Sequence, residues 1–176
     1  MPKSGSKNLS WKIDMINIED FNKKVIKKKK EHRKFFSKLK NINPKKLDQY
    51  IHPIHDEVFS CTDCLKCANC CKTTSPIFSD RDISRIAKHL RTKPSVLTDK
   101  YLKLDEDKEY VLKKTPCTFL GDDNRCSIYD VRPKACREYP HTDRVKQSQI
   151  LHLTKKNVEV CPAVFEIVDK LKAAIR

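Results

Sequence analysis

Glycine is scarce in this sequence, and long apolar runs are missing. Only 2 glycines occur among 176 residues, so the chain has no glycine-rich loop of the kind that binds a nucleotide or a methyl donor. The absence of 18 consecutive apolar residues argues against a transmembrane helix. Residues 1–20 also lack the apolar core of a secretory signal. We therefore expect a cytoplasmic protein without membrane insertion.

Basic residues dominate the charge and are concentrated near the start of the chain. The formal net charge is +15, and residues 1–60 contribute +8 of it, from 15 Lys and Arg against 7 Asp and Glu. The densest run, residues 22–34, is typical of either a solvated helix face or a nucleic-acid surface. No arginine-rich or aromatic-interleaved stretch accompanies the lysines, which favours the solvated face. Nucleic acid is therefore disfavoured as a partner.

Apolar periodicity predicts a mainly helical α+β protein. Residues 18–40 read as an amphipathic helix, and a second helix begins at Pro44 and is kinked or ended by Pro53. Ser79 and Asp82 form a capping-box-like pattern before the next helix. Other short elements are expected as helices at residues 93–104 and 161–176, strands at residues 108–114 and 149–154, and a turn around Gly121.

The length suits one domain with an appendage, because 176 residues are too few for two full-sized domains. Residues 1–58 are expected to form a lysine-rich helical extension. Residues 59–176 are expected to form a small cysteine-rich domain organised by metal, with few strands.

Cysteine is abundant, and its spacing indicates metal binding. Of the 9 cysteines, five lie in CTDCLKCANCC, residues 61–71, at intervals of three with the last two adjacent. A C-x-x-C turn brings two sulfurs to one metal, whereas a reducing cytosol disfavours disulfides. Because these thiols supply enough ligands, His32, His52 and His55 are interpreted as structural.

The adjacent pair Cys70 and Cys71 indicates more than one metal. Neighbouring side chains point to opposite faces of an extended chain and about 100° apart in a helix, so the pair suits a single ion poorly. The two thiols would serve separate centres or different metals of one polynuclear cluster. Setting Cys61 aside leaves eight thiols, which fit two four-thiolate centres, or one cluster beside a structural or catalytic group.

Iron–sulfur and zinc are the candidate cofactors. CLKCANC, residues 64–70, has the spacing of a bacterial ferredoxin ligand loop, and Cys161 is followed by proline as in those proteins, which favours a [4Fe–4S] cluster. Zinc accepts scattered thiolates equally well. Arg132 and Arg137 flank Cys136 and are candidates to donate to cluster sulfurs, or alternatively to form surface ion pairs.

Three segments together resemble the YkgJ-like cysteine-cluster family, often described as zinc- or iron-chelating: CLKCANCC, PCTFLGDDNRCSIYDVRPKACREYP and the late Cys-Pro. The resemblance covers about residues 59–165 and implies metal or iron–sulfur binding. Cys61 lies outside the usual pattern, and Leu65 and Ala68 stand in a loop where many relatives carry a glycine after the second cysteine. The ligands implied by the match are Cys64, Cys67, Cys70, Cys71, Cys117, Cys126, Cys136 and Cys161.

Three functions remain open at this point. The first is a metal or iron–sulfur binding protein whose centre organises the fold. The second is a redox or protein-modifying enzyme, with Cys61 or Cys71 as a non-ligand thiol; a related cysteine cluster in flagellin lysine N-methylases hints at such a role. The third is a zinc-stabilised nucleic-acid adaptor using residues 23–40. A protein partner or substrate is open, and the sequence does not predict the oligomeric state.

Overall fold

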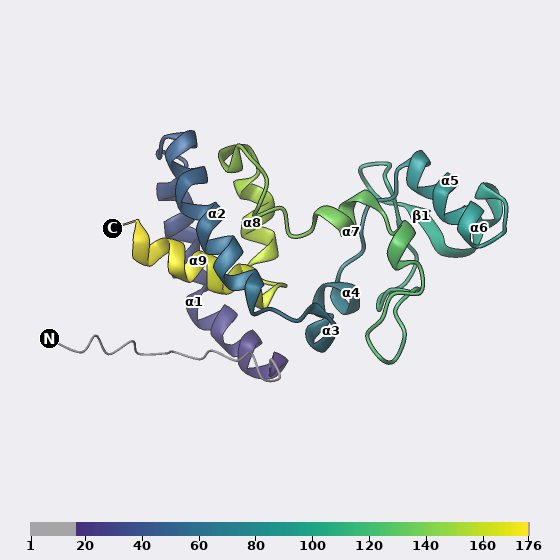
Figure 1. The fold of residues 1–176 in the computed structure, drawn as a ribbon, viewed down its shortest axis with the longest axis horizontal. Coiled ribbons are helices and arrows are strands. Elements are labelled where there is room, and N and C mark those ends of the chain that lie inside the picture. Colours follow the sequence, from purple (N-terminus) through teal and green to yellow (C-terminus); the bar gives the residue numbers. More distant parts are fainter. Residues whose placement is uncertain (1–16, 176) are drawn as a thin grey trace, which may run out of the picture.

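A computed structural model describes residues 17–175, which form two lobes joined by a cysteine-bearing segment (Figure 1). One lobe, called the helical lobe, holds α1 (Ile18–Leu39), α2 (Pro44–Ser60), α8 (Leu151–Asn157) and α9 (Pro162–Ala174). The other, called the second lobe, holds α5 (Asp80–His89), α6 (Pro94–Tyr101), β1 (Leu102–Leu104) and β2 (Tyr110–Leu112). The prediction of a mainly helical α+β protein is confirmed.

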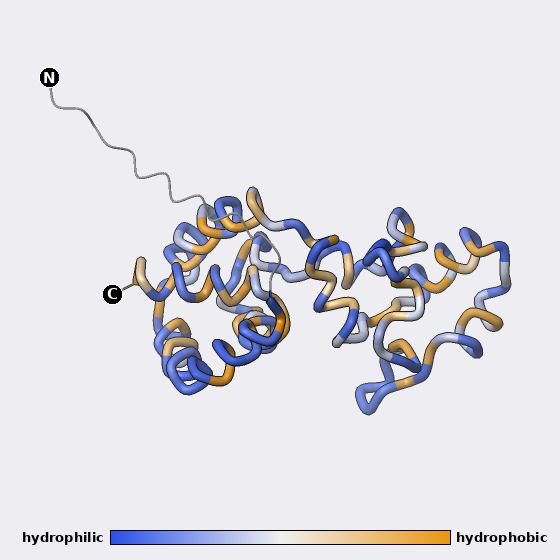
Figure 2. The backbone as a smooth tube through the Cα atoms, turned by 90° about the horizontal axis from the view of Figure 1, so that it is seen from below, coloured by the Kyte–Doolittle hydropathy of each residue, from blue (hydrophilic) through white to orange (hydrophobic). Residues whose placement is uncertain are grey.

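Short helices lie between the lobes. They are α3 (Cys64–Cys67), α4 (Asn69–Thr73) and α7 (Lys134–Glu138), and Figure 2 shows the same division from a second direction. Two 3-10 turns complete the elements, η1 (Tyr129–Val131) and η2 (Gln147–Gln149). None of the helices within residues 17–175 has the length and apolar composition needed to span a bilayer.

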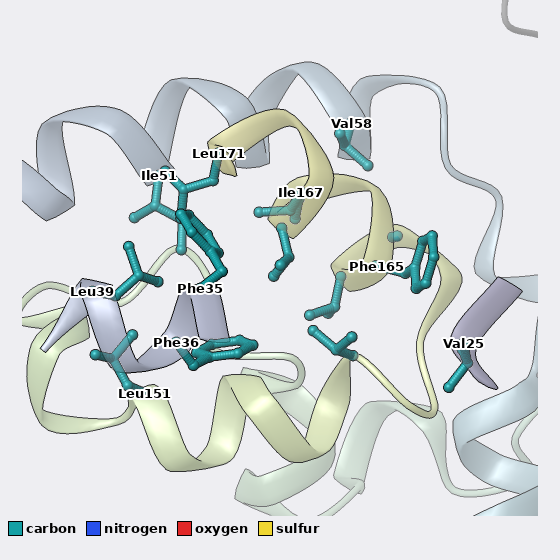
Figure 3. Packing of buried hydrophobic residues seen from close by; sticks show 14 of the residues in the cluster. Val25, Phe35, Phe36, Leu39, Ile51, Val58, Leu151, Phe165, Ile167 and Leu171 are labelled. Atoms are coloured by element: carbon teal, nitrogen blue, oxygen red, sulfur yellow. The ribbon is translucent and has the colours of Figure 1, made fainter. Parts of the chain in front are cut away.

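The core of the helical lobe is built from helices far apart in the sequence. The side chain of Asn17 accepts the backbone N–H groups of Glu19 and Asp20 and so caps α1. The apolar stripe of α1 packs with α2, α8 and α9 around Ile167 and Leu171 (Figure 3). The predicted boundary near residue 58 stays a prediction, but the helices before it share this one hydrophobic core with the C-terminal helices.

A smaller core holds the second lobe together. Ile86, Leu97 and Phe78 are almost fully buried there, beside the antiparallel pair β1 and β2, in which Leu102 faces Leu112. The expected capping box is confirmed, because Ser79 Oγ accepts the Asp82 N–H while the Asp82 carboxylate accepts the Ser79 N–H.

Three expectations about individual elements need correction. Residues 149–154, expected as a strand, instead run through η2 into α8, because Leu151, Thr154 and Val158 at helical spacing are buried against the core of the helical lobe. The helix expected at residues 93–104 ends at Tyr101, and its last residues become β1. Pro53 does not end the second helix, which continues to Ser60.

Candidate metal centre

The loop carrying the first four candidate ligands folds as two single-turn helices with a sharp corner between them. Asp63 begins α3 by accepting the Leu65 N–H, and Ala68 forms the corner in a left-handed conformation with φ of 47°. This conformation favours glycine because a side chain there is strained. Ala68 directly follows Cys67, one of the candidate ligands.

Four thiols surround one cavity and are called here the first cysteine group. The cavity, about 50 Å³, lies between α3, α4 and the start of α9. The cysteines that line it are Cys64, Cys67, Cys70 and Cys161. Cys161 lines the same cavity as the other three although it lies about ninety residues further along the chain. Burial raises the pKa of Cys161 to about 11, and the nearby Cys64 and Cys67 thiols add to the rise.

The other four candidate ligands also lie near one another and are called the second cysteine group. Burial raises the pKa of Cys136 to about 12, and the thiols of Cys71, Cys117 and Cys126 add to that rise. Such influence requires proximity, because the interaction between two charges weakens with distance. This group therefore joins α4 and α7 to the loop that precedes η1.

The two groups meet at Cys70 and Cys71, whose sulfurs lie 4.0 Å apart. A hydrogen bond from Cys70 lowers the pKa of Cys71 to about 7, and the same contact raises the pKa of Cys70. Cys71 also raises the pKa of Cys64, so it influences the first group as well as the second. The 4.0 Å between these two sulfurs does not show that they bind different metals. The reason to assign them to different metals is that the other six thiols lie in two sets of three, one near Cys70 and one near Cys71.

Backbone N–H groups lie near several of these sulfurs. Burial raises the pKa of Cys117, but the nearby N–H groups of Phe119 and Leu120 oppose the rise. The N–H of Ile128 opposes the rise in the pKa of Cys126 in the same way. At the N-terminus of α9, the N–H groups of Val164 and Ala163 oppose the rise in the pKa of Cys161. Donors placed in this way stabilise thiolates, the form in which cysteine binds metal.

Hydrogen bonds between distant segments hold the two groups in place. Asn69 Nδ2 donates to the Val160 carbonyl at 2.7 Å, which fixes α4 beside the residue that precedes Cys161. The Cys117 N–H donates to the Cys71 carbonyl at 2.9 Å and joins two members of the second group. Each hydrogen bond connects two residues that lie dozens of positions apart in the sequence.

A buried carboxylate fixes α7, which carries Cys136. Asp82 Oδ1 accepts from Arg85 at 2.5 Å and from the Lys134 N–H at 3.1 Å, where α7 begins. Arg85 also donates to the Arg132 carbonyl at 2.9 Å. Burial alone would raise the pKa of Asp82, but hydrogen bonds from Ser79, Arg85 and Lys134 hold it below its usual range.

The donor set fits a metal, although the sulfurs are not closed onto one. Within residues 17–175, no three Cys, His, Asp or Glu side chains are arranged to hold an ion. Zinc lies about 2.3 Å from a thiolate, so the thiols would have to move closer together to share an ion. Eight thiols in two sets, backbone N–H groups beside them and a cavity nevertheless coincide. The buried hydroxyl of Tyr139, which lines that cavity, has no hydrogen-bond partner among these residues.

Over residues 63–162 the sequence matches the family described as "Putative zinc- or iron-chelating domain". The chain belongs to this family. All eight candidate ligands lie inside the matched range, and Cys61 lies before it. Family membership supports chelation of zinc or iron through the cysteines.

Another relative carries no assigned function. An uncharacterized protein of Methanocaldococcus jannaschii is 29% identical over 90 residues, which is 49% of this chain and 48% of that protein. The chain thus spans about half the length of this curated relative. No solved structure matches the sequence.

The remaining candidate residues are Arg132, Arg137 and Cys61. The Arg132 guanidinium lies 3.8 Å from the centre of the Tyr129 ring, and its charge opposes the rise in the pKa of Cys126 and Cys136. Arg137 is exposed on α7, so its predicted role stays a prediction. Cys61 is exposed at the end of α2, and its sulfur donates to the Glu57 carbonyl.

The histidines have packing roles. His32 is buried, with Nε2 2.9 Å from Asp169 Oδ1. His52 bonds to the Arg144 carbonyl at 3.0 Å. His55 Nδ1 lies 2.7 Å from Thr142 Oγ1. These contacts agree with the structural interpretation of the histidines.

Two further residues of the site were missed by sequence reasoning. Asn69 and Tyr139 both line the cavity of the first group. Tyr139 belongs to the segment CREYP, in which Cys136 and Arg137 were the predicted site residues, and an aromatic residue beside them is typical of packing. Its position directly after a ligand-bearing helix was the available signal.

Proposed function

We propose that this protein holds two adjoining metal centres, an iron–sulfur cluster at the first cysteine group and a zinc ion at the second. Chelation of zinc or iron follows from the family, whereas the division between two sites is the proposal. The observation that carries it is the cavity lined by Cys64, Cys67, Cys70 and Cys161. These four thiols are also the ones that follow the ferredoxin ligand pattern.

The ligand pattern supports iron–sulfur at the first group. Bacterial ferredoxin clusters take three thiolates from a C-x-x-C-x-x-C run and a fourth from a remote Cys-Pro. Cys161, which precedes Pro162, lies on the same cavity as the run 64–70. The N–H groups at the start of α9 face Cys161 and offset the negative charge that four thiolates bring. A cluster bound there would supply one-electron transfer.

The origin of its ligands supports zinc at the second group. Its four thiols come from α4, from the two sides of the Leu120–Cys126 bridge and from α7. Structural zinc is held by four thiolates from short, separate segments and needs no inorganic sulfide. The backbone donors at Cys117 and Cys126 fix the sulfurs in the way that ligands of structural zinc are usually oriented.

The positions of the two groups give the metals an architectural role. The first group includes Cys161, which begins α9 of the helical lobe, and the second includes Cys117 and Cys126, which pack against the core of the second lobe. The two groups meet on α4, between the lobes (Figure 1). Bound metals would therefore fasten both lobes to the same short helix.

Metal content of the purified chain tests this proposal. The full chain is purified without oxygen, and iron, sulfide and zinc are measured beside the visible absorption spectrum. We expect about four iron atoms and about one zinc ion per chain, with an absorption band at about 400 nm. A colourless protein with about two zinc ions and no iron would contradict the iron–sulfur assignment, and a chain that retains no metal would contradict both assignments.

A further inference from the structure

Tyr139 lines the cavity of the first cysteine group and carries a buried hydroxyl. It ends α7 and lines that cavity together with its neighbour Pro140. The hydroxyl oxygen is buried, and within residues 17–175 no hydrogen-bond partner is found for it. Buried polar atoms in native proteins are nearly always hydrogen-bonded, so an unpaired one needs an explanation.

The other polar side chains around the cavity already have partners. Asn69 Nδ2 donates to the Val160 carbonyl, and Thr62 Oγ1 donates to the Val58 carbonyl. Most of the remaining wall consists of apolar side chains and the four thiols. The four thiols, together with the Asn69 side-chain oxygen, are therefore acceptors available in this wall to the Tyr139 hydroxyl.

The Tyr139 hydroxyl is also held in the form that donates. Burial raises its pKa, and the thiols of Cys161, Cys70 and Cys67 raise it further, in that order. The thiols that act on it belong to the first group, so the hydroxyl lies near them. A tyrosine hydroxyl, with an ordinary pKa of about 10, carries its proton at neutral pH. A tyrosine hydroxyl that keeps its proton beside thiolates is a hydrogen-bond donor to them.

We propose that Tyr139 donates a hydrogen bond to a sulfur atom of the centre bound by the first cysteine group, and so positions and tunes that centre. The inference rests on the proposed function, because it needs a metal centre there. Hydrogen bonds to cluster sulfurs raise the reduction potential by stabilising the more negative, reduced state. Tyr139 also helps the thiolates to keep their metal, because it offsets their negative charge.

The test compares Tyr139→Phe with the wild-type chain, because phenylalanine keeps the ring and removes only the hydroxyl. Tyr129→Phe is the matched control, since Tyr129 is 56% exposed and does not line this cavity. Each full-length protein is loaded with iron and sulfide without oxygen, and its iron content and midpoint reduction potential are measured. Parallel zinc-loaded samples are titrated with a chelator.

We expect Tyr139→Phe to take up the same amount of iron as the wild-type chain but to show a lower reduction potential. Its zinc at the first group should be lost to chelator about ten-fold more readily, the usual effect of removing a hydrogen-bond partner of metal ligands. Tyr129→Phe should match the wild type in both measurements. A purely structural role for Tyr139 would lower iron uptake without shifting the potential of the cluster that does form.

Two outcomes would overturn the inference, and they are distinguishable. If the wild type assembles an iron–sulfur cluster at the first group and Tyr139→Phe has the same potential and the same chelator sensitivity, the hydrogen bond does not exist and the proposed function stands. If the wild type takes up neither iron nor zinc at the first group, the proposed function fails, and the inference fails with it.

Discussion

The helical lobe and the second lobe differ in how much apolar material holds them together. The core of the helical lobe contains 16 buried hydrophobic residues, whereas that of the second lobe contains 9 and includes only a two-stranded sheet. Because burial of apolar surface is the main stabilising contribution, we expect the folding of the helical lobe to depend less on metal. We expect a greater dependence for the second lobe, which carries Cys117 and Cys126 at the edge of its core.

Metal removal should produce the largest difference in stability between the two lobes. Structural zinc contributes about 10 kcal/mol of binding free energy in small domains, and this contribution becomes folding free energy. We expect a chelator under reducing conditions to abolish protection from hydrogen exchange in α5, α6 and the sheet while α9 remains protected. Equal loss of protection in α9 and α5 would show that the helical lobe is not independent.

Truncation of one buried isoleucine in each core sharpens the same comparison. Ile167 and Ile86 are both 0% exposed, so each change to alanine should cost about 2–5 kcal/mol of unfolding free energy. Ile86→Ala should also weaken metal retention, because the loop bearing the second group packs on that core, whereas Ile167→Ala should not. Ile26→Ala, at a side chain 75% exposed, serves as the control. Equal metal retention in both core variants would contradict the coupling.

Asp82 gives the second lobe a dependence on pH. Its folded pKa lies below the ordinary value of 3.8, so the stability it contributes is present above about pH 4 and is lost as pH falls through the folded pKa. Asp82→Asn should cost about 1–3 kcal/mol at neutral pH, because it leaves donors from Ser79 and Arg85 poorly paired. In urea unfolding, the difference in unfolding free energy between Asp82→Asn and the wild type should become smaller below pH 4. A gap that stays constant with pH would rule out this role.

The smallest expected effect concerns the corner at Ala68. Ala68→Gly relieves the left-handed conformation but removes a buried methyl group, so the net change should be less than about 1 kcal/mol. Ala87→Gly, the same change inside α5, should cost about 1–2 kcal/mol because there is no strain to relieve. Thermal unfolding of the two variants checks this, and equal losses would show that Ala68 carries no strain.

Sequence reasoning succeeded where local chemistry decides structure. The Ser79 capping box and the apolar stripe of α1 were predicted because each depends on residues a few positions apart. It failed at α8, since the short apolar segment at residues 149–154 suits a strand or a helix equally until its packing partners are known.

The candidate site was predictable as a set of residues but not as an arrangement. Spacing and family resemblance predicted the eight thiols, and the adjacency of Cys70 and Cys71 indicated more than one metal, either in separate centres or in one polynuclear cluster. The ferredoxin pattern already linked Cys161 to residues 64–70, whereas the proximity of Cys71 to Cys117, Cys126 and Cys136 appears only in the folded chain. The role of Tyr139 likewise appears only when the cavity and its unpaired hydroxyl are seen together.

The most direct measurement of the central claim is the metal content of two serine variants. Cys161→Ser removes a ligand of the first group, and Cys126→Ser removes one of the second, whereas Cys61→Ser removes the thiol outside both. After anaerobic purification, we predict that Cys161→Ser loses iron and keeps zinc, that Cys126→Ser loses zinc and keeps iron, and that Cys61→Ser keeps both. Loss of both metals in equal proportion from Cys161→Ser and from Cys126→Ser would contradict two separate centres.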